Sequence, residues 1–216
     1  MRQTVAQDLL SRYRSMVLEA ANEAATRLKI IDHILKDVLN WIDDDISPEE
    51  HVSEDGNSTF SDYILRTAST AIVIEAKKVG AAFTVSKAQR RVKLSNSFLQ
   101  SELGAAIMQA RDYARKLSID FAVATNGSVW AIFAAQRHDQ VKFNDSSALV
   151  FWSLEDALQE NYQEFFDLLS RDSVISGSLE RGLLGRAENQ IENRKLNSYF
   201  TANPRISQSK ALSNEV

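Results

Sequence analysis

The chain has 216 residues, of which 44% are hydrophobic and 25% charged, and its formal net charge is −4 at pH 7. This composition is ordinary for one substantial globular domain, and the negative net charge argues against binding nucleic acid by bulk electrostatic attraction alone. The lack of cysteine excludes disulfides and thiolate metal sites and fits a reducing cytoplasm. No apolar run is long enough to predict a membrane span.

The N-terminal region predicts helices followed by a hairpin. Apolar residues recur at helical spacing from Val5 to about Trp41 with no glycine or proline between them, which predicts one long or two successive amphipathic helices. Residues 43–58 are acidic and predict a turn-rich loop. Two strand-like stretches, 59–66 and 71–76, are separated by a short polar break, which predicts a hairpin.

The second half alternates helices and strands after a polar, irregular stretch at 80–97. A helix is predicted over about 100–117, and Ser153 is a plausible N-cap for a helix to about residue 169. Asn126-Gly127 predicts a tight turn between two antiparallel strands. Short apolar runs predict these two strands at 120–125 and 129–134, and one or two edge strands at 141–143 and 148–151.

This order of elements predicts an α/β domain with a central four- to five-stranded mixed β-sheet flanked by helices, followed by a helical C-terminal extension. We expect the domain to cover residues 1–170 and the helical extension 171–200. Residues 201–216 are polar and are expected to form a tail or linker.

A group of charged residues stands where the predicted hairpin ends. If residues 71–77 form a strand, Val73, Glu75 and Lys77 share one face. Asp62 is the one acid between Gly56 and Glu75, and the hairpin can bring it close. Two converging carboxylates repel each other unless a cation lies between them, and oxygen-only ligands suit Mg²⁺ or Mn²⁺. Lys77 could then polarise a water or stabilise charge developing on a phosphate.

Further polar residues add to this group. Gln109 and Tyr113 lie four apart on one face of the predicted helix, where each can hydrogen-bond a phosphate, a water or a carboxylate. Glu23, at the start of a predicted helix, is a third acid that could reach the site. A basic stretch between the strand and the helix supplies candidate DNA-binding residues, namely Lys78, Lys87, Arg90, Arg91 and Lys93.

Taken in order, these residues resemble the PD-(D/E)xK nuclease superfamily, most specifically the N-terminal nuclease domain of the motor subunit of type I restriction enzymes. The resemblance covers about residues 20–135. It depends on a glutamate before a Thr-Arg helix, an acid followed by Glu-x-Lys, a Gln-x-x-x-Tyr helix and a Thr-Asn-Gly turn before an aromatic residue. The matching residues are Glu23, Thr26, Arg27, Ile31, Asp32, Leu35, Trp41, Asp62, Glu75, Lys77, Gln109, Tyr113, Thr125, Asn126, Gly127 and Trp130.

The resemblance implies a restriction-endonuclease-like fold and Mg²⁺- or Mn²⁺-dependent hydrolysis of DNA phosphodiesters in prokaryotic restriction or antiphage defence. Asp62 and Glu75 would ligate the metal, with Glu23 as a third acid or an indirect ligand through water. Lys77 would act on the nucleophilic water. Gln109 and Tyr113 would orient the site or the DNA backbone.

Three departures from the family pattern leave alternatives open. Ser61 stands where the motif is named for a proline, and the stretch before Gln109 is longer and more basic than the pattern. The sequence has no P-loop, so a motor or ATPase is missing or lies elsewhere. The main alternative is a catalytically silent module of the same fold that binds DNA or protein within a larger assembly. Glu75 and Lys77 could also be an exposed ion pair, and self-association through the terminal helices remains open.

Overall fold

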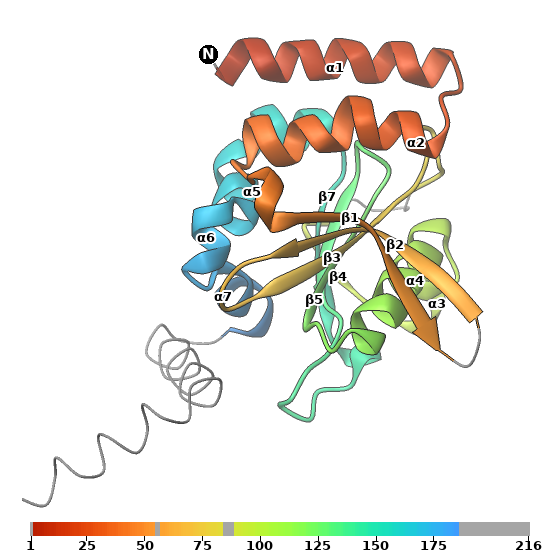
Figure 1. Cartoon of the computed structure of the whole chain (residues 1–216), viewed down its shortest axis with the longest axis vertical. Coiled ribbons are helices and arrows are strands. Elements are labelled where there is room, and N and C mark those ends of the chain that lie inside the picture. The colour runs from red at the N-terminus through yellow and green to blue at the C-terminus, as the bar shows by residue number, and fades with distance from the viewer. Residues whose placement is uncertain (1, 55–56, 84–88, 186–216) are drawn as a thin grey trace, which may run out of the picture.

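The computed structural model describes residues 2–54, 57–83 and 89–185. In this part of the chain, helices cover both faces of a seven-stranded mixed sheet (Figure 1). The predicted α/β class with a helix-flanked mixed sheet is therefore confirmed. The strand order is β1-β2-β3-β5-β6-β7-β4. The strands are β1 (Ile46–Glu54), β2 (Asn57–Arg66), β3 (Ala71–Ala76), β4 (Arg91–Lys93), β5 (Phe121–Thr125), β6 (Trp130–Ala134) and β7 (Ser147–Phe151).

The sheet contains one parallel pair, β3 with β5, and its other neighbouring strands are antiparallel. The two predicted hairpins are confirmed, since β2 pairs with β3 and β5 pairs with β6. The predicted strand at 148–151 is β7, which lies between β6 and β4 rather than at an edge. The predicted strand at 141–143 is wrong, because the chain instead forms a 3₁₀ turn, η4 (Phe143–Asp145).

Two strands that the sequence did not predict raise the number from the expected four or five to seven. β1 lies in the acidic stretch interpreted as a loop, and β4 lies in the stretch interpreted as irregular. Both are outermost strands of the sheet. An outermost strand pairs on one side alone, so it tolerates Pro48 and polar residues that a central strand would not. Their pairing partners, rather than their own pattern, make these segments strands.

Each face of the sheet packs against its own hydrophobic core. Ile72, Ile74 and Ala76 of β3 belong to the core under the N- and C-terminal helices. Val73 belongs to the other core, beneath α4 (Glu102–Lys116), which begins after the short helix α3 (Asn96–Leu99). The alternation predicted for residues 71–77 is therefore confirmed, and the face that carries Glu75 is the face that α4 covers.

Two successive helical segments precede the sheet, as predicted. The first is α1 (Arg2–Leu18). The second begins where the Asn22 side chain accepts a hydrogen bond from the backbone N–H of Ala25 at 2.8 Å. It continues through α2 (Glu23–Thr26), η1 (Arg27–Ile31) and η2 (Ile34–Val38), and a 3₁₀ turn, η3 (Asp43–Asp45), leads into β1. None of the helices described in residues 2–185 is long and apolar enough to cross a membrane.

The C-terminal helices complete the first core. Ser153 caps the helical segment as predicted, since its Oγ accepts a hydrogen bond from the backbone N–H of Asp156. The segment comprises η5 (Asp156–Glu160) and α5 (Tyr162–Leu169), followed by α6 (Arg171–Ile175) and α7 (Ser178–Leu184). Val174, Leu179 and Leu183 are buried in the same core as β3, so α6 and α7 are integral to the domain. The rest of the predicted extension and tail, 186–216, lies outside the described residues.

Gly104 sets how closely α4 approaches α3. A Cβ atom at this position would lie 2.5 Å from the backbone oxygen of Phe98 and 2.5 Å from the Cα of Leu99. Backbone atoms cannot move aside as a flexible side chain can, so the start of α4 requires a residue without a side chain. This placement also sets the position of Gln109 and Tyr113, which α4 carries.

We expect Gly104→Ala to lower the free energy of unfolding by about 1–3 kcal/mol, although alanine normally favours a helix over glycine. The matched control is Gly182→Ala in α7, where the added Cβ would meet the mobile end of Leu168 at 2.9 Å. The control should change stability by less than about 1 kcal/mol. Urea denaturation measures the free energy of unfolding of both variants. An equal loss of stability in the two would contradict the close approach of the α3 backbone as the cause.

Candidate active site

Asp62 and Glu75 lie on neighbouring antiparallel strands. Tyr63 pairs with Ile74, so the register continued by one residue sets Asp62 opposite Glu75. Asp62 Oδ2 accepts a hydrogen bond of 2.7 Å from the backbone N–H of Ala76, which joins the two strands at this point. Both residues are buried, Glu75 being 2% exposed and Asp62 9%. The structure thus brings together the two acids that the sequence predicted to converge.

Lys77 connects this pair to α4. Its ammonium group donates hydrogen bonds to Glu75 Oε1 at 2.6 Å and to Gln109 Oε1 at 2.9 Å. Gln109 in turn donates from Nε2 to the Tyr113 hydroxyl at 3.2 Å. Four residues singled out from the sequence therefore form one continuous chain of hydrogen bonds from β3 to α4. The alternative of an exposed Glu75–Lys77 pair is wrong, because the Glu75 carboxylate is buried.

Burial raises the pKa of Glu75 to about 7. The hydrogen bond from Lys77 opposes this rise, while the neighbouring Asp62 and Glu23 carboxylates add to it. Burial also raises the pKa of Asp62, against the hydrogen bond from Ala76 and the charge of Arg27. In both acids the largest cause is burial, which disfavours the charged form of a carboxylate. Perturbed pKa values of this kind cluster at functional sites.

Lys77 remains protonated near neutral pH. Burial lowers the pKa of an ammonium group, but the hydrogen bond to Glu75 and the surrounding acids outweigh burial, so the pKa of Lys77 is raised. Lys77 is thus a hydrogen-bond donor and a fixed positive charge rather than a general base.

Glu23 lies within electrostatic reach of the pair. It is the first residue of α2 and is half-buried. Burial raises its pKa, the Asp62 carboxylate raises it further, and Lys77 and Arg27 lower it. These interactions place Glu23 near the site, as predicted from the sequence.

The carboxylates offer a binding position for a divalent cation. Glu75 Oε2 is buried and has no hydrogen-bond partner among the described residues, and a buried polar atom without a partner is rare. An Mg²⁺ or Mn²⁺ ion typically binds one or two carboxylates and completes its shell with water, so Asp62 and Glu75 fit such an ion. The described residues contain no group of three or more His, Asp or Glu side chains gathered as a metal site. Glu23 therefore fits the role of an outer acid better than that of a direct ligand.

Arg27 is the main site residue to which the sequence assigned no role. Its guanidinium donates to Asp62 Oδ1 at 2.8 Å. Asp32, on the same helical segment, accepts a hydrogen bond of 2.6 Å from the Tyr63 hydroxyl. These contacts hold the segment against β2. The spacing of Glu23 and Arg27, four residues apart on a predicted helix, is the signal that could have identified Arg27.

Two buried polar residues fix the chain beyond Lys77. The Thr26 hydroxyl accepts a hydrogen bond from the backbone N–H of Val79 at 3.0 Å. Asn126 donates from its side-chain amide to the carbonyl of Ala81 at 3.0 Å, and it accepts from the N–H groups of the following turn. The turn at Asn126-Gly127 is therefore formed as predicted, and it also anchors the segment after β3.

Most of the predicted DNA-binding cations lie far from the acids. Arg90 forms an ion pair with Asp156 at 2.6 Å and is stacked 4.0 Å from the ring centre of Phe151. β4, which carries Arg91 and Lys93, is four strand positions from β3, or about 19 Å.

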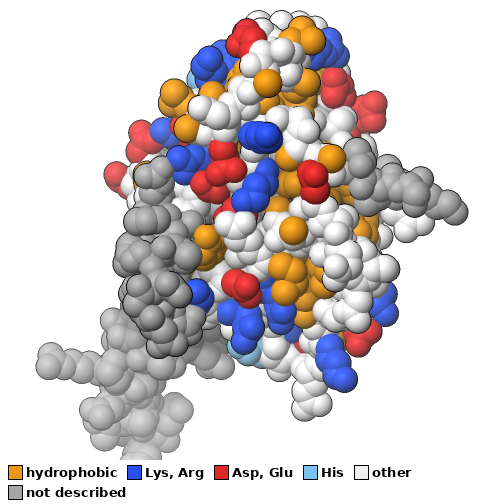
Figure 2. All heavy atoms as spheres, turned by 90° about the vertical axis from the view of Figure 1, so that its right-hand side faces the viewer, with side chains coloured by type: hydrophobic (Ala, Val, Ile, Leu, Met, Phe, Trp, Pro, Cys, Tyr) orange, Lys and Arg blue, Asp and Glu red, His pale blue; other side chains and the backbone are white. Residues whose placement is uncertain are grey.

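Arg91 donates to the carbonyl of Gly182, and Lys93 pairs with Asp145 at 3.1 Å. Lys78 is exposed directly after Lys77, and Lys87 lies outside the described residues. DNA contact by these five residues stays a prediction. Figure 2 shows acidic and basic side chains interspersed on one face of the molecule, rather than a continuous basic surface.

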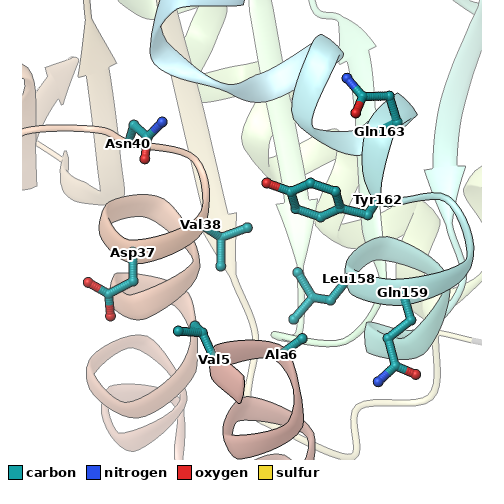
Figure 3. Close-up of a pocket in the computed structure, with 9 residues that line it drawn as sticks. All are labelled: Val5, Ala6, Asp37, Val38, Asn40, Leu158, Gln159, Tyr162 and Gln163. Atoms are coloured by element: carbon teal, nitrogen blue, oxygen red, sulfur yellow. The ribbon is translucent and has the colours of Figure 1, made fainter. Parts of the chain in front are cut away.

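A hollow of about 610 Å³ lies apart from the acids, between α1, η2 and the η5–α5 segment (Figure 3). Its inner wall is apolar, with Val5, Val38 and Leu158 pointing toward one another, and amide side chains such as Gln159 and Gln163 stand at its rim. Its lining includes one acid, Asp37, which contacts His33 at 2.6 Å. The residues that line this hollow do not form a set typical of a catalytic site.

The site is therefore a buried pair of carboxylates joined to a charged lysine. No protein-family model matches the chain, and no curated protein matches it. Among solved structures, the chain is similar to a fragment assigned to an HsdR subunit of a type I restriction enzyme from Vibrio vulnificus YJ016, at 24% identity and a TM-score of 0.38. The match covers 54% of this chain and 21% of that chain.

We expect Glu75→Gln to stabilise the protein in a pH-dependent way. The folded protein retains the Glu75 proton up to a pKa of about 7, whereas the unfolded chain releases it near 4.5, so the free energy of unfolding falls as pH rises between these values. Glutamine does not titrate. In metal-free buffer the free energy of unfolding of the variant should therefore exceed that of the native protein by up to about 3 kcal/mol at about pH 8, and by little at about pH 5.

Urea denaturation across this pH range measures the effect. Glu160→Gln, at an exposed position, is the matched control and should show no such trend. If the free energies of unfolding of Glu75→Gln and the native protein differed by the same amount at all pH values, the raised pKa of Glu75 would be contradicted.

Proposed function

We propose that this chain is a metal-dependent endonuclease domain that hydrolyses DNA phosphodiester bonds within a prokaryotic restriction or antiphage defence system. The observation that carries the proposal is the Glu75 carboxylate, which is buried beside Asp62. One of its oxygens is bonded to Lys77, and the other has no hydrogen-bond partner in the part of the chain that the structure describes. Buried acids with raised pKa values destabilise a fold, and they are typical of functional sites.

Asp62 and Glu75 would hold Mg²⁺ or Mn²⁺, with Glu23 as an outer acid. When bound, such an ion lowers the pKa of a coordinated water and neutralises charge on the phosphate. Arg27 keeps Asp62 in position through the ion pair at 2.8 Å. Because this contact uses Asp62 Oδ1 and Ala76 uses Oδ2, the orientation of the carboxylate is fixed before any ligand arrives.

Lys77 would act as a donor and as a positive charge. An ammonium group has three N–H donors, and the bonds to Glu75 and Gln109 use two of them. The third can orient the attacking water or bind a phosphate oxygen as negative charge develops on it. Gln109 positions Lys77, and the Tyr113 hydroxyl, which accepts from Gln109, can donate its own proton to the DNA backbone.

A second candidate function is a catalytically silent module that binds DNA or protein in a larger assembly. It is favoured by one observation, that both Asp62 oxygens already accept hydrogen bonds from Arg27 and Ala76. In this alternative the charged group is a self-contained structural network. The nuclease proposal is compatible with a motor or ATPase in a partner domain or subunit and with the lack of one.

Metal binding separates the two functions. We expect Mn²⁺ to bind more tightly at about pH 8 than at about pH 6 and to release up to about one proton per ion, because the Glu75 proton competes with the metal. Calorimetric titration in buffers of different ionisation enthalpy measures both quantities. Asp62→Asn should abolish the signal, whereas Asp167→Asn, at an exposed position, should retain it. An absence of binding at millimolar metal would favour the silent module.

Cleavage of plasmid DNA tests the catalytic role of Lys77. We expect Lys77→Met to lower the rate in Mg²⁺ or Mn²⁺ by at least about a hundredfold, because it removes the donor beside Glu75. Lys29→Met is the control, since Lys29 is exposed on η1 and has no role in the site. Equal cleavage by the native protein and Lys77→Met would show that the lysine is not needed.

A further inference from the structure

A second hollow lies at another place on the sheet, away from the carboxylates. The acids stand where β3 and β5 end, whereas a hollow of about 610 Å³ opens beside Ala134 of β6. Ala134 pairs with Phe121, the first residue of β5. The length of β5 thus separates the two regions by about 13 Å. The hollow is bounded by the last turns of α4, the segment after β6 and η4.

The lining of this hollow is strongly basic in a chain of net charge −4. Arg111, Arg115, Arg137 and Lys142 line it together with His138, and no carboxylate is among the described residues that do so. Two of these groups have nearby acids. Arg137 is paired with Asp139, and His138 contacts Asp120 at 3.0 Å. Within the described residues the remaining three cations, Arg111, Arg115 and Lys142, form no ion pair, and the Asp112 carboxylate interacts with Arg111 only through its charge.

Arg111 is held in place by contacts that do not neutralise it. Its guanidinium lies 3.9 Å from the centre of the Phe143 ring, and its Nε donates to the carbonyl of Ala135 at 3.3 Å. Burial lowers the pKa of Arg111, the nearby positive charge of Arg115 lowers it further, and the Asp112 carboxylate opposes both effects without outweighing them. The two arginines are four residues apart on α4, where like charges destabilise a helix. This arrangement becomes favourable once an anion lies between them.

We propose that this hollow binds the phosphate groups of a nucleotide, with Arg111, Arg115 and Lys142 as the recognition residues. Guanidinium groups bind phosphate through paired hydrogen bonds, and lysine adds a point charge. A hollow of this volume is in the range that holds a ligand of nucleotide size. The Arg111 guanidinium is stacked on the Phe143 ring, and arginine planes are also surfaces on which bases stack.

The proposed site is distinct from the proposed catalytic site. Gln109 and Tyr113 occupy one side of α4, and Arg111 and Arg115 project about 200° around the helix from them. A ligand in the basic hollow therefore does not contact Lys77. The nucleotide can be free or part of a single strand, since both present the same phosphate chemistry. The inference does not depend on nuclease activity.

Binding to the full-length protein in EDTA tests the inference, because EDTA keeps the carboxylate site free of metal. The probes are ATP, pyrophosphate and a short fluorescent oligothymidylate, measured by calorimetry or anisotropy at low salt. We expect Arg115→Glu and Lys142→Glu each to weaken binding by about tenfold. Both residues are exposed, so the variants should fold, and circular dichroism checks this. Lys29→Glu, the same charge reversal at an exposed residue outside the hollow, should change binding by less than about twofold.

The outcomes are distinct. Binding of ATP or pyrophosphate that is weakened by Arg115→Glu supports a free nucleotide, and binding confined to the oligonucleotide, with the same sensitivity, supports a single strand. Equal weakening by Lys29→Glu would show that net charge alone is responsible and would overturn the site. Absence of binding by all three probes at millimolar concentration would overturn it as well.

Discussion

The burial of Glu75 at the end of β3 is the constraint on which the rest of the site depends. A carboxylate that is 2% exposed cannot rely on water for its charge, so the surrounding elements must supply partners. Lys77 supplies one at 2.6 Å, and the strand connection through Asp62 and Ala76 fixes the geometry. The second oxygen of Glu75 has no hydrogen-bond partner among the described residues, and the pKa values of Glu75 and Asp62 are both raised. These two features make the carboxylate pair available to bind a ligand.

Helices on both faces of the sheet hold this charged group together. α4 brings Gln109 to Lys77, and its approach depends on Gly104, where backbone from α3 leaves no room for a side chain. From the other side, Arg27 reaches Asp62, and Thr26 fixes the chain just beyond Lys77. The site therefore joins three segments distant in sequence, and each is anchored by hydrogen bonds to backbone or carboxylate. Such anchoring is what holds a catalytic group in a productive geometry.

The candidate carboxylates and the basic hollow lie at different places on the sheet. The carboxylates lie near the end of β3, and the hollow lies beside Ala134, at the end of β6. α4 contacts both regions, because Gln109 and Tyr113 lie on the side of the helix that is bonded to Lys77, whereas Arg111 and Arg115 lie on the opposite side and line the hollow. A protein with a net charge of −4 has little general attraction for nucleic acid. Local basic sites of this kind, or a partner, are then required for affinity.

The sequence by itself determined the alternation of residues 72–77, the helical spacing of Gln109 and Tyr113 and the turn at Asn126-Gly127. These features follow from local backbone geometry, since side chains alternate in a strand and recur every three to four residues in a helix. They were sufficient to identify Asp62, Glu75 and Lys77 as one group. The α/β class followed from the same patterns.

Only the tertiary structure decided which strands complete the sheet and which charges are available. β1 and β4 are strands because β2 and β7 offer them free hydrogen-bonding edges, a property that neither segment carries in its own pattern. Arg90 appeared free in a basic run, yet the fold pairs it with Asp156, while Arg111 and Arg115, inconspicuous in a helix, line the basic hollow. Local spacing fixes the face of an element on which a side chain lies, but its partner is set by packing between residues far apart in the chain.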